Sequence, residues 1–154
     1  TLKPMTINPE LQGRSYRLGE AYSVGRESIR DFARAVKATH AAHFDVAAAQ
    51  ALGHADLVAP PTYAIIVAQR ADALLINDSD SGIDFSRVVH AEESFTAAAP
   101  IVAGQLLATA VHVDSITQRG GLTLVTTRTV VTDSADASLV TSVVSTLAVR
   151  GEDV

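Results

Sequence analysis

The chain has 154 residues, carries a formal net charge of −5 and contains no cysteine. Its length fits one domain, and a hydrophobic fraction of 47% excludes a disordered tail. The acidic balance argues against nucleic-acid binding, and the lack of cysteine excludes disulfides, thiolate nucleophiles and cysteine metal sites.

The beginning of the chain shows no targeting signal. Residues 1–15 form a lead-in with Pro, Asn and Glu but without an apolar core, so no signal peptide is predicted. No apolar run reaches the roughly 18 residues of a membrane span. We therefore expect a cytoplasmic protein with neither a membrane nor a nucleic-acid partner.

The first predicted elements are extended and then helical. Residues 16–24 suit a short strand or an extended lead-in. A helix is predicted from Glu27 to Lys37, because its apolar residues recur at helical spacing. A loop is expected over 38–46.

The middle of the chain leads into a second, more apolar helix. Ala47 to Leu52 suits a short helical turn that ends at Gly53. Pro60 and Pro61 suit the start of a helix, where their missing N–H groups are not needed. Residues 62–76 are apolar nearly all round, which predicts a buried helix.

The second half of the chain is rich in strands, which follow a predicted loop at 77–84. Their alternating β-branched residues and short turns predict an antiparallel meander. The four predicted strands are Phe85–Ala97, Gln105–Ile116, Leu122–Thr132 and Leu139–Val149.

A buried helix followed by such strands predicts an α+β domain. We expect a single hot-dog domain over residues 16–150, with an antiparallel sheet of about five strands wrapped around a long central helix. A cone-shaped NTF2-like domain is the alternative, since it too pairs early helices with a curved sheet.

Four motifs follow one another between Gly13 and Gly151: VGRE…FARAVK, APPT at 59–62, PIVAGQL at 100–106 and the ending TLAVRG. In this order they resemble the MaoC-type hydratase/dehydratases. The resemblance is closest to the accessory, non-catalytic subunits of heterodimeric (3R)-hydroxyacyl-ACP dehydratases of mycolic-acid elongation, and to uncharacterised proteins related to them.

The resemblance implies positions for the catalytic residues. Catalytic members of that family carry a D-x-N-P-x-H-x-D loop and, after it, a glycine whose backbone N–H polarises the thioester carbonyl. The catalytic histidine falls on His43, the following carboxylate on Asp45 and the family's Asn on His40. The catalytic Asp falls on Ala38, and the glycine falls on Pro61.

Two of these positions depart from the family's pattern. Dehydrating a 3-hydroxyacyl thioester needs a base, an acid for the leaving hydroxyl and a donor at the developing oxyanion. Ala38 is neither acid nor base, and Pro61 has no N–H to donate. Losing an oxyanion donor costs about 10²–10³ in rate, and losing a general acid or base about 10²–10⁴. Whether the chain is itself a hydro-lyase therefore stays open here.

The resemblance implies a subunit of a (3R)-hydroxyacyl-thioester dehydratase of fatty-acid elongation. Such a subunit would bind the acyl chain of an acyl-ACP or acyl-CoA and support a catalytic hot-dog partner. The implied substrate-binding residues are Pro61, Thr62, Tyr63 and Ile66. The alternatives are a stand-alone homodimeric enoyl-thioester hydratase or dehydratase that uses His43, and a non-catalytic small-ligand-binding domain. We expect a homodimer or a heterodimer with a catalytic hot-dog subunit.

The remaining polar residues have simpler explanations. The spacing of His40, His43 and Asp45 matches no strong metal motif, so neither a metal nor a cofactor is predicted. A loop histidine with one polar contact is the simpler interpretation of His43.

Several arginines need an explanation of their own. Arg26, Arg30 and Arg34 suit a solvated helix face or a patch for a phosphopantetheine arm or an acidic carrier protein. Arg70 lies in the apolar helix, where a charge is costly unless it is paired. We expect it to meet a carboxylate or a subunit seam.

Overall fold

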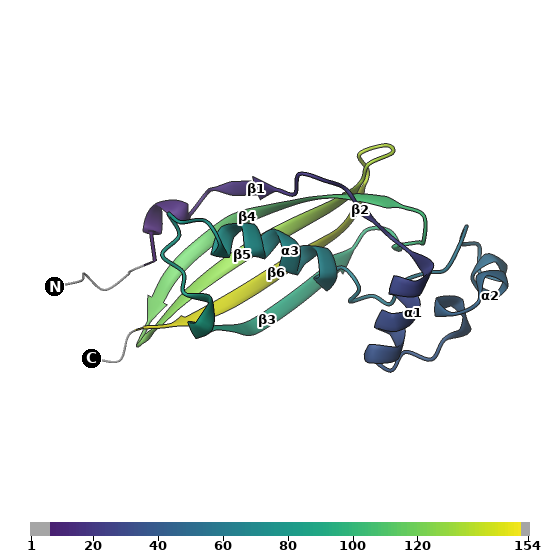
Figure 1. Ribbon diagram of the computed structural model, residues 1–154, viewed down its shortest axis with the longest axis horizontal. Coiled ribbons are helices and arrows are strands. Elements are labelled where there is room, and N and C mark those ends of the chain that lie inside the picture. The colour runs from purple at the N-terminus through teal and green to yellow at the C-terminus, as the bar shows by residue number, and fades with distance from the viewer. Residues whose placement is uncertain (1–6, 152–154) are drawn as a thin grey trace.

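A curved antiparallel sheet wraps around one helix, α3 (Ile65–Ile76), and two shorter helices, α1 (Arg26–Ala35) and α2 (Val46–Ala51), lie together at one end (Figure 1). The structure, a computed structural model, describes residues 7–151. The six strands are β1 (Ser15–Arg17), β2 (Tyr22–Ser23), β3 (Val88–Ala97), β4 (Leu106–Arg119), β5 (Leu122–Asp133) and β6 (Leu139–Arg150). Three 3₁₀ turns complete the elements: η1 (Pro9–Leu11), η2 (Ala41–His43) and η3 (Phe85–Arg87). This arrangement confirms the hot-dog domain.

The strand order is β1-β4-β5-β6-β3, and β2 also pairs with β4. The strands β4, β5 and β6 form the predicted antiparallel meander, but β3 does not continue it next to β4, and that part of the prediction was wrong. β3 lies beside β6, the last strand, rather than beside β4, which follows it in the chain. Alternation fixes which face each side chain takes but not which strand is its neighbour. As a result, β3 is an edge strand of the sheet.

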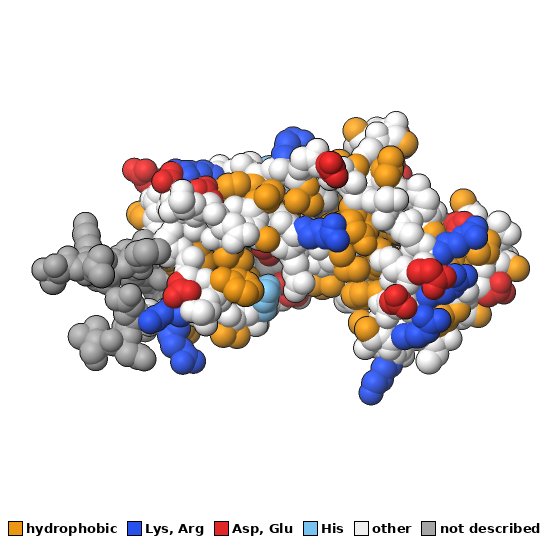
Figure 2. Space-filling model, viewed as in Figure 1, with side chains coloured by type: hydrophobic (Ala, Val, Ile, Leu, Met, Phe, Trp, Pro, Cys, Tyr) orange, Lys and Arg blue, Asp and Glu red, His pale blue; other side chains and the backbone are white. Residues whose placement is uncertain are grey.

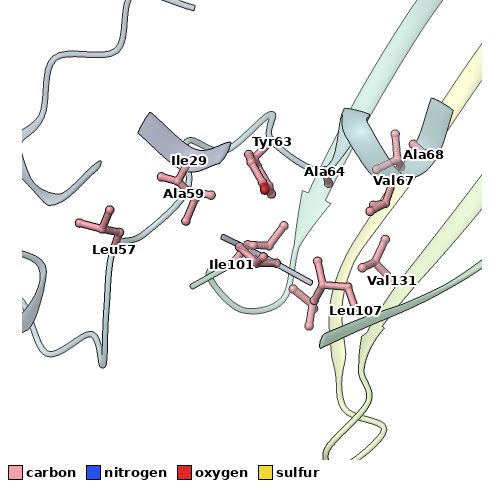
Figure 3. Close-up of a cluster of buried hydrophobic side chains, with 13 residues drawn as sticks. Ile29, Leu57, Ala59, Tyr63, Ala64, Val67, Ala68, Ile101, Leu107 and Val131 are labelled. Atoms are coloured by element: carbon pink, nitrogen blue, oxygen red, sulfur yellow. The ribbon is translucent and has the colours of Figure 1, made fainter. Parts of the chain in front are cut away.

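The concave face of the sheet buries α3 in two clusters. In the first, Val67 and Ala68 of α3 are buried with Leu107, Val131 and Val143 of three different strands. Figure 3 shows this cluster continuing past Tyr63 toward α1. The second cluster lies at the other end of α3 and contains Leu75, Val113, Val125 and Leu147. Small side chains such as Ala68 and Ala71, both fully buried, let the sheet approach the helix closely.

The helix ends differ slightly from the prediction. α1 ends at Ala35, because Lys37 takes the left-handed conformation with φ 59° and stops the helix. α3 begins at Ile65, after a turn over residues 61–64 in place of a helix that starts at the prolines. Between residues 7 and 151, none of the helices has the length and apolar character that crossing a bilayer requires.

One acidic side chain lies inside the interface between helix and sheet. Asp72 of α3 is only 2% exposed. The hydroxyl of Thr127 on β5 donates a hydrogen bond to its Oδ1 at 2.8 Å. Burial, together with the nearby charge of Glu93, raises the pKa of Asp72 to about 6. The folded protein therefore holds a proton at Asp72 at pH values where the unfolded chain has released it.

This raised pKa predicts a pH-dependent stability that Asp72→Asn should remove. The ordinary pKa of aspartate is 3.8. Between that pH and about pH 6, the folded state binds more protons than the unfolded state, so the stability of the wild type falls as the pH rises. Above about pH 6, the stability that protonation of Asp72 contributes is fully lost. Urea unfolding should show the variant more stable than wild type at neutral pH by about 1–3 kcal/mol, with little gain near pH 4.

The control for this prediction removes an exposed charge. Asp114 of β4 pairs with Arg128 of β5. The side chain of Asp114 is 41% exposed. Asp114→Asn should leave the slope of stability against pH across this window close to that of wild type. Identical slopes for wild type and Asp72→Asn would contradict the prediction.

Candidate functional site

The loop between α1 and α2 is fixed by two short side-chain caps. The backbone N–H of Ala42 donates to His40 Nδ1 at 3.1 Å and caps η2. The backbone N–H of Ala47 donates to Asp45 Oδ1 at 3.3 Å and caps α2. Asp45 is thus the N-cap of a helix, and it does not join His40 and His43 in lining the pocket described below.

The half-buried His43 is held by one strong backbone contact. Its Nδ1 lies 2.6 Å from the carbonyl oxygen of Val58. Because a carbonyl oxygen only accepts, Nδ1 carries the proton in the neutral ring, and Nε2 keeps its lone pair. The rings of His43 and His40 lie edge to face with centroids 6.1 Å apart. This tautomer leaves Nε2 able to accept a proton.

His43 lines an open pocket of about 580 Å³. The pocket lies between η2, the segment at 54–61 and the connection from β3 to β4 at 97–101. His40 and His54 share its wall, and Thr141 of β6 closes one side. The rest of the lining is small and apolar, including Ala59, Pro60, Pro61, Ala98, Ala99 and Pro100. The site therefore offers imidazoles at the edge of an apolar hollow.

Of the four residues implied as substrate-binding, Pro61 lines the pocket. Thr62 is exposed just beyond it, and Ile66 is half-buried against the first core cluster. Tyr63 is 1% exposed and points into that cluster between α1 and α3 (Figure 3). Its hydroxyl lies 2.7 Å from Ser28 Oγ, and burial raises its pKa, so the phenol stays neutral. Tyr63 therefore joins α1 to the core.

Sequence reasoning missed His54 and the segment at 97–101. His54 is separated from His43 by a whole helix, and the 97–101 segment reaches the pocket only because β3 pairs with β6. Neither position carries a local signal, because His54 reaches the pocket by the return of the chain after α2 and the 97–101 segment reaches it through the order of the strands. Within the described part of the chain, no group of three histidine or acidic side chains is placed to hold a metal ion.

The arginines of α1 are neutralised by neighbouring carboxylates. Figure 2 shows acidic and basic side chains mixed over this end of the molecule. The pairs are Arg26 with Asp56 at 2.8 Å, Arg34 with Asp31 at 3.1 Å, and Arg30 with Glu27. Each arginine therefore has a local partner, and α1 presents a mixed surface rather than a uniformly basic one.

Arg70 meets an aromatic ring. Its guanidinium lies over the ring of Tyr22, 4.8 Å from the centroid. No carboxylate lies within ion-pair distance of it among residues 7–151, so the carboxylate alternative was wrong, while a position at a subunit seam stays a prediction. The side chain is exposed, and water removes the need for a counter-ion.

The pocket offers a proton acceptor, but the two other groups that dehydration needs, a general acid and an oxyanion donor, have no counterpart at Ala38 and Pro61. His43 offers a base at Nε2. Pro61 lines the pocket but, as a proline, has no backbone N–H to donate to an oxyanion. Ala38, which follows α1, carries no titratable group. The geometry suits binding of an apolar chain better than complete acid–base chemistry.

Comparison with known proteins bears on this site. The family described as "FAS1-like, dehydratase domain region" matches residues 10–142. A UPF0336 protein of Clavibacter michiganensis subsp. michiganensis is 47% identical, covering 97% of this chain and 99% of its own.

Two solved structures share both the fold and a substantial part of the sequence. One is a crystal structure of the C-terminally truncated HadBC (3R-hydroxyacyl-ACP dehydratase) complex from Mycobacterium tuberculosis. The match has 35% identity and a TM-score of 0.82, and covers 90% of this chain and 96% of the other. The second, a MaoC-like dehydratase, has 32% identity and a TM-score of 0.84 over 92% of this chain, but over only 43% of its own.

The contact between His43 and Val58 predicts a specific histidine tautomer. ¹⁵N NMR at about pH 8.5, where an ordinary histidine is neutral, should show His43 protonated at Nδ1 and unprotonated at Nε2. His43→Gln would assign the signal by its loss, and His54→Gln would serve as the matched control. A ring protonated at Nε2 would contradict the geometry.

Proposed function

Because this chain belongs to the family of the FAS1-like dehydratase region and has its MaoC-like hot-dog fold, we propose that it is the supporting subunit of a (3R)-hydroxyacyl-thioester dehydratase. It binds the acyl chain of an acyl-ACP or acyl-CoA in fatty-acid elongation, and a second hot-dog subunit supplies the complete catalytic set. The cytoplasmic location expected from the sequence stays a prediction.

One observation carries the proposal. The resemblance carries the catalytic histidine onto His43 and the oxyanion glycine onto Pro61, and both residues line the pocket. His43 keeps the lone pair of Nε2, Pro61 has no N–H, and Ala38, which takes the acid position by resemblance, lies outside the pocket lining and carries no acidic group. A dehydratase needs all three groups in place at once. The pocket walls are nonetheless small and apolar, which supports retention of a thioester's acyl portion.

The sheet offers an edge for the partner. β3 pairs with β6 on one side, and its other side ends the sheet. Two large apolar side chains stand exposed near its beginning, Phe85 at 68% and Val89 at 60%. An open edge with exposed apolar residues favours pairing with another chain. The HadBC complex, a heterocomplex of dehydratase subunits, supports a hot-dog partner for this chain.

A second candidate function is favoured by the tautomer of His43. A pocket-lining histidine with an unprotonated Nε2 suits a general base, so a homodimer with a rearranged site would also be able to hydrate an enoyl thioester. Turnover by the chain alone distinguishes the two functions.

The activity assay has a clear expected outcome. The purified chain should hydrate crotonyl-CoA no faster than the His43→Ala variant. Adding a catalytic hot-dog subunit with an intact D-x-N-P-x-H loop should give a stable heterodimer with turnover. Ultraviolet loss of the enoyl thioester measures both rates. Turnover by the chain alone that disappears in His43→Ala would favour the second candidate instead.

Acyl binding can be tested separately from catalysis. Ala99 is exposed on the pocket wall, so Ala99→Trp should fill the hollow without disturbing the core. We expect calorimetry to show dodecenoyl-pantetheine binding about tenfold more weakly to this variant, or about 1.4 kcal/mol.

The matched control for this variant is Ala135→Trp in the exposed turn after β5, which lies outside the pocket. This variant should bind dodecenoyl-pantetheine like wild type. Equal weakening by both substitutions would argue against acyl binding at this pocket.

A further inference from the structure

A second cavity lies at the other end of α3 and is separate from the histidine pocket. It measures about 350 Å³ and opens between α3, η3 and the start of β3. Its lining includes Gln69, Asp72, Ala73, Ile76, Phe85 and His90. On the face that carries α3 and β3, Figure 2 shows hydrophobic side chains beside a histidine. The proposed function above makes no use of this cavity.

Two acidic side chains next to this cavity each keep one unsatisfied oxygen. Asp72 Oδ1 accepts from Thr127, and Glu93 Oε2 accepts from Ser145 Oγ at 2.7 Å. Asp72 Oδ2 and Glu93 Oε1 are buried and have no hydrogen-bond partner among the described residues. His90 Nε2, at 3.9 Å from Glu93 Oε1, is too distant for a hydrogen bond. The cluster therefore lacks at least two donors.

The chemistry of the missing group follows from these atoms. Buried carboxylate oxygens without donors are costly, and a charged donor satisfies them best. Ile76 and the exposed ring of Phe85 line the cavity, so a group that enters it gains from an apolar portion next to its donors. Lysine and arginine combine such a stem with several N–H donors. Two acidic side chains this close together disfavour the binding of phosphates and carboxylates.

The location of the cavity indicates where such a side chain would come from. His90, in its wall, belongs to β3, and Glu93 lies three residues further along the same strand. β3 is the open edge proposed above for the partner subunit. A subunit seated along that edge would place its own side chains directly over the cavity.

We propose that the cavity between α3 and β3 receives a lysine or arginine side chain from the hot-dog partner seated on the β3 edge, where it satisfies Asp72 and Glu93. This inference rests on the proposed partnership and specifies its contact chemistry. The acidic pair then acts as a selectivity element, because a partner without a basic residue at that point leaves both carboxylates unsatisfied in the interface.

The chemistry of the cavity is tested first on the isolated chain. n-Butylguanidinium stands in for the arginine side chain, and n-butylurea is its neutral counterpart of similar shape. NMR shifts of the His90 ring should report guanidinium binding at least about tenfold tighter than urea binding. Asp72→Asn and Glu93→Gln, both close in shape to the native residues, should each remove most of that preference. Equal binding of the two probes would overturn the inference.

The partner is tested next with the heterodimer. Asp72→Asn should weaken association with the catalytic hot-dog subunit about tenfold or more, as measured by analytical ultracentrifugation. Asp114→Asn removes one exposed carboxylate from the opposite face of the sheet and should leave association unchanged. If Asp72→Asn associates as tightly as wild type, the inference is wrong.

The two possible failures can be told apart. A chain that selects butylguanidinium but forms no heterodimer overturns the partner assignment here and the proposed function together. A heterodimer that is indifferent to Asp72→Asn and Glu93→Gln overturns only the acidic receptor and leaves the proposed function intact.

Discussion

The burial of α3 is the constraint on which the rest of the structure depends. Its buried faces meet strands on several sides, with Val67 and Ala68 in one cluster and Leu75 in the other. A helix with so little polar surface is stable only inside a sheet that curls around it. The short side chains at Ala68 and Ala71 allow that curl by bringing helix and strands close together. The hot-dog form follows from this one burial requirement.

The same constraint places both cavities. Because α3 occupies the interior, polar groups gather at its two ends and along its open side. The loop before the helix carries the histidine pocket, whose wall includes Pro61. The side of α3 that faces the edge strand carries Asp72, against Glu93 of β3. One end thus carries the histidine pocket, and the other holds two acidic side chains that each keep one buried oxygen without a hydrogen-bond partner among the described residues.

Local periodicity predicted the helices and the long strands, and family resemblance located His43 and Pro61 at one pocket. Strand order was not predictable, because alternation in β3 suits a neighbour on either side. The contribution of Thr141 to the pocket was missed for that reason, whereas that of His54 depends on how the chain returns after α2. Asp72 stands among apolar residues and was overlooked; its relation to Glu93 arises only when β3 and α3 come together.

The irregularity of β3 has a consequence for the fate of a newly made chain. A bare sheet edge is a template for uncontrolled aggregation into stacked strands. Here the pairing register shifts between His90 and Glu92, and two adjacent glutamates follow that irregularity in the strand. A straight, uncharged strand from a misfolded neighbour would not match this kinked, acidic edge. The edge can thus stay open during synthesis without seeding fibres.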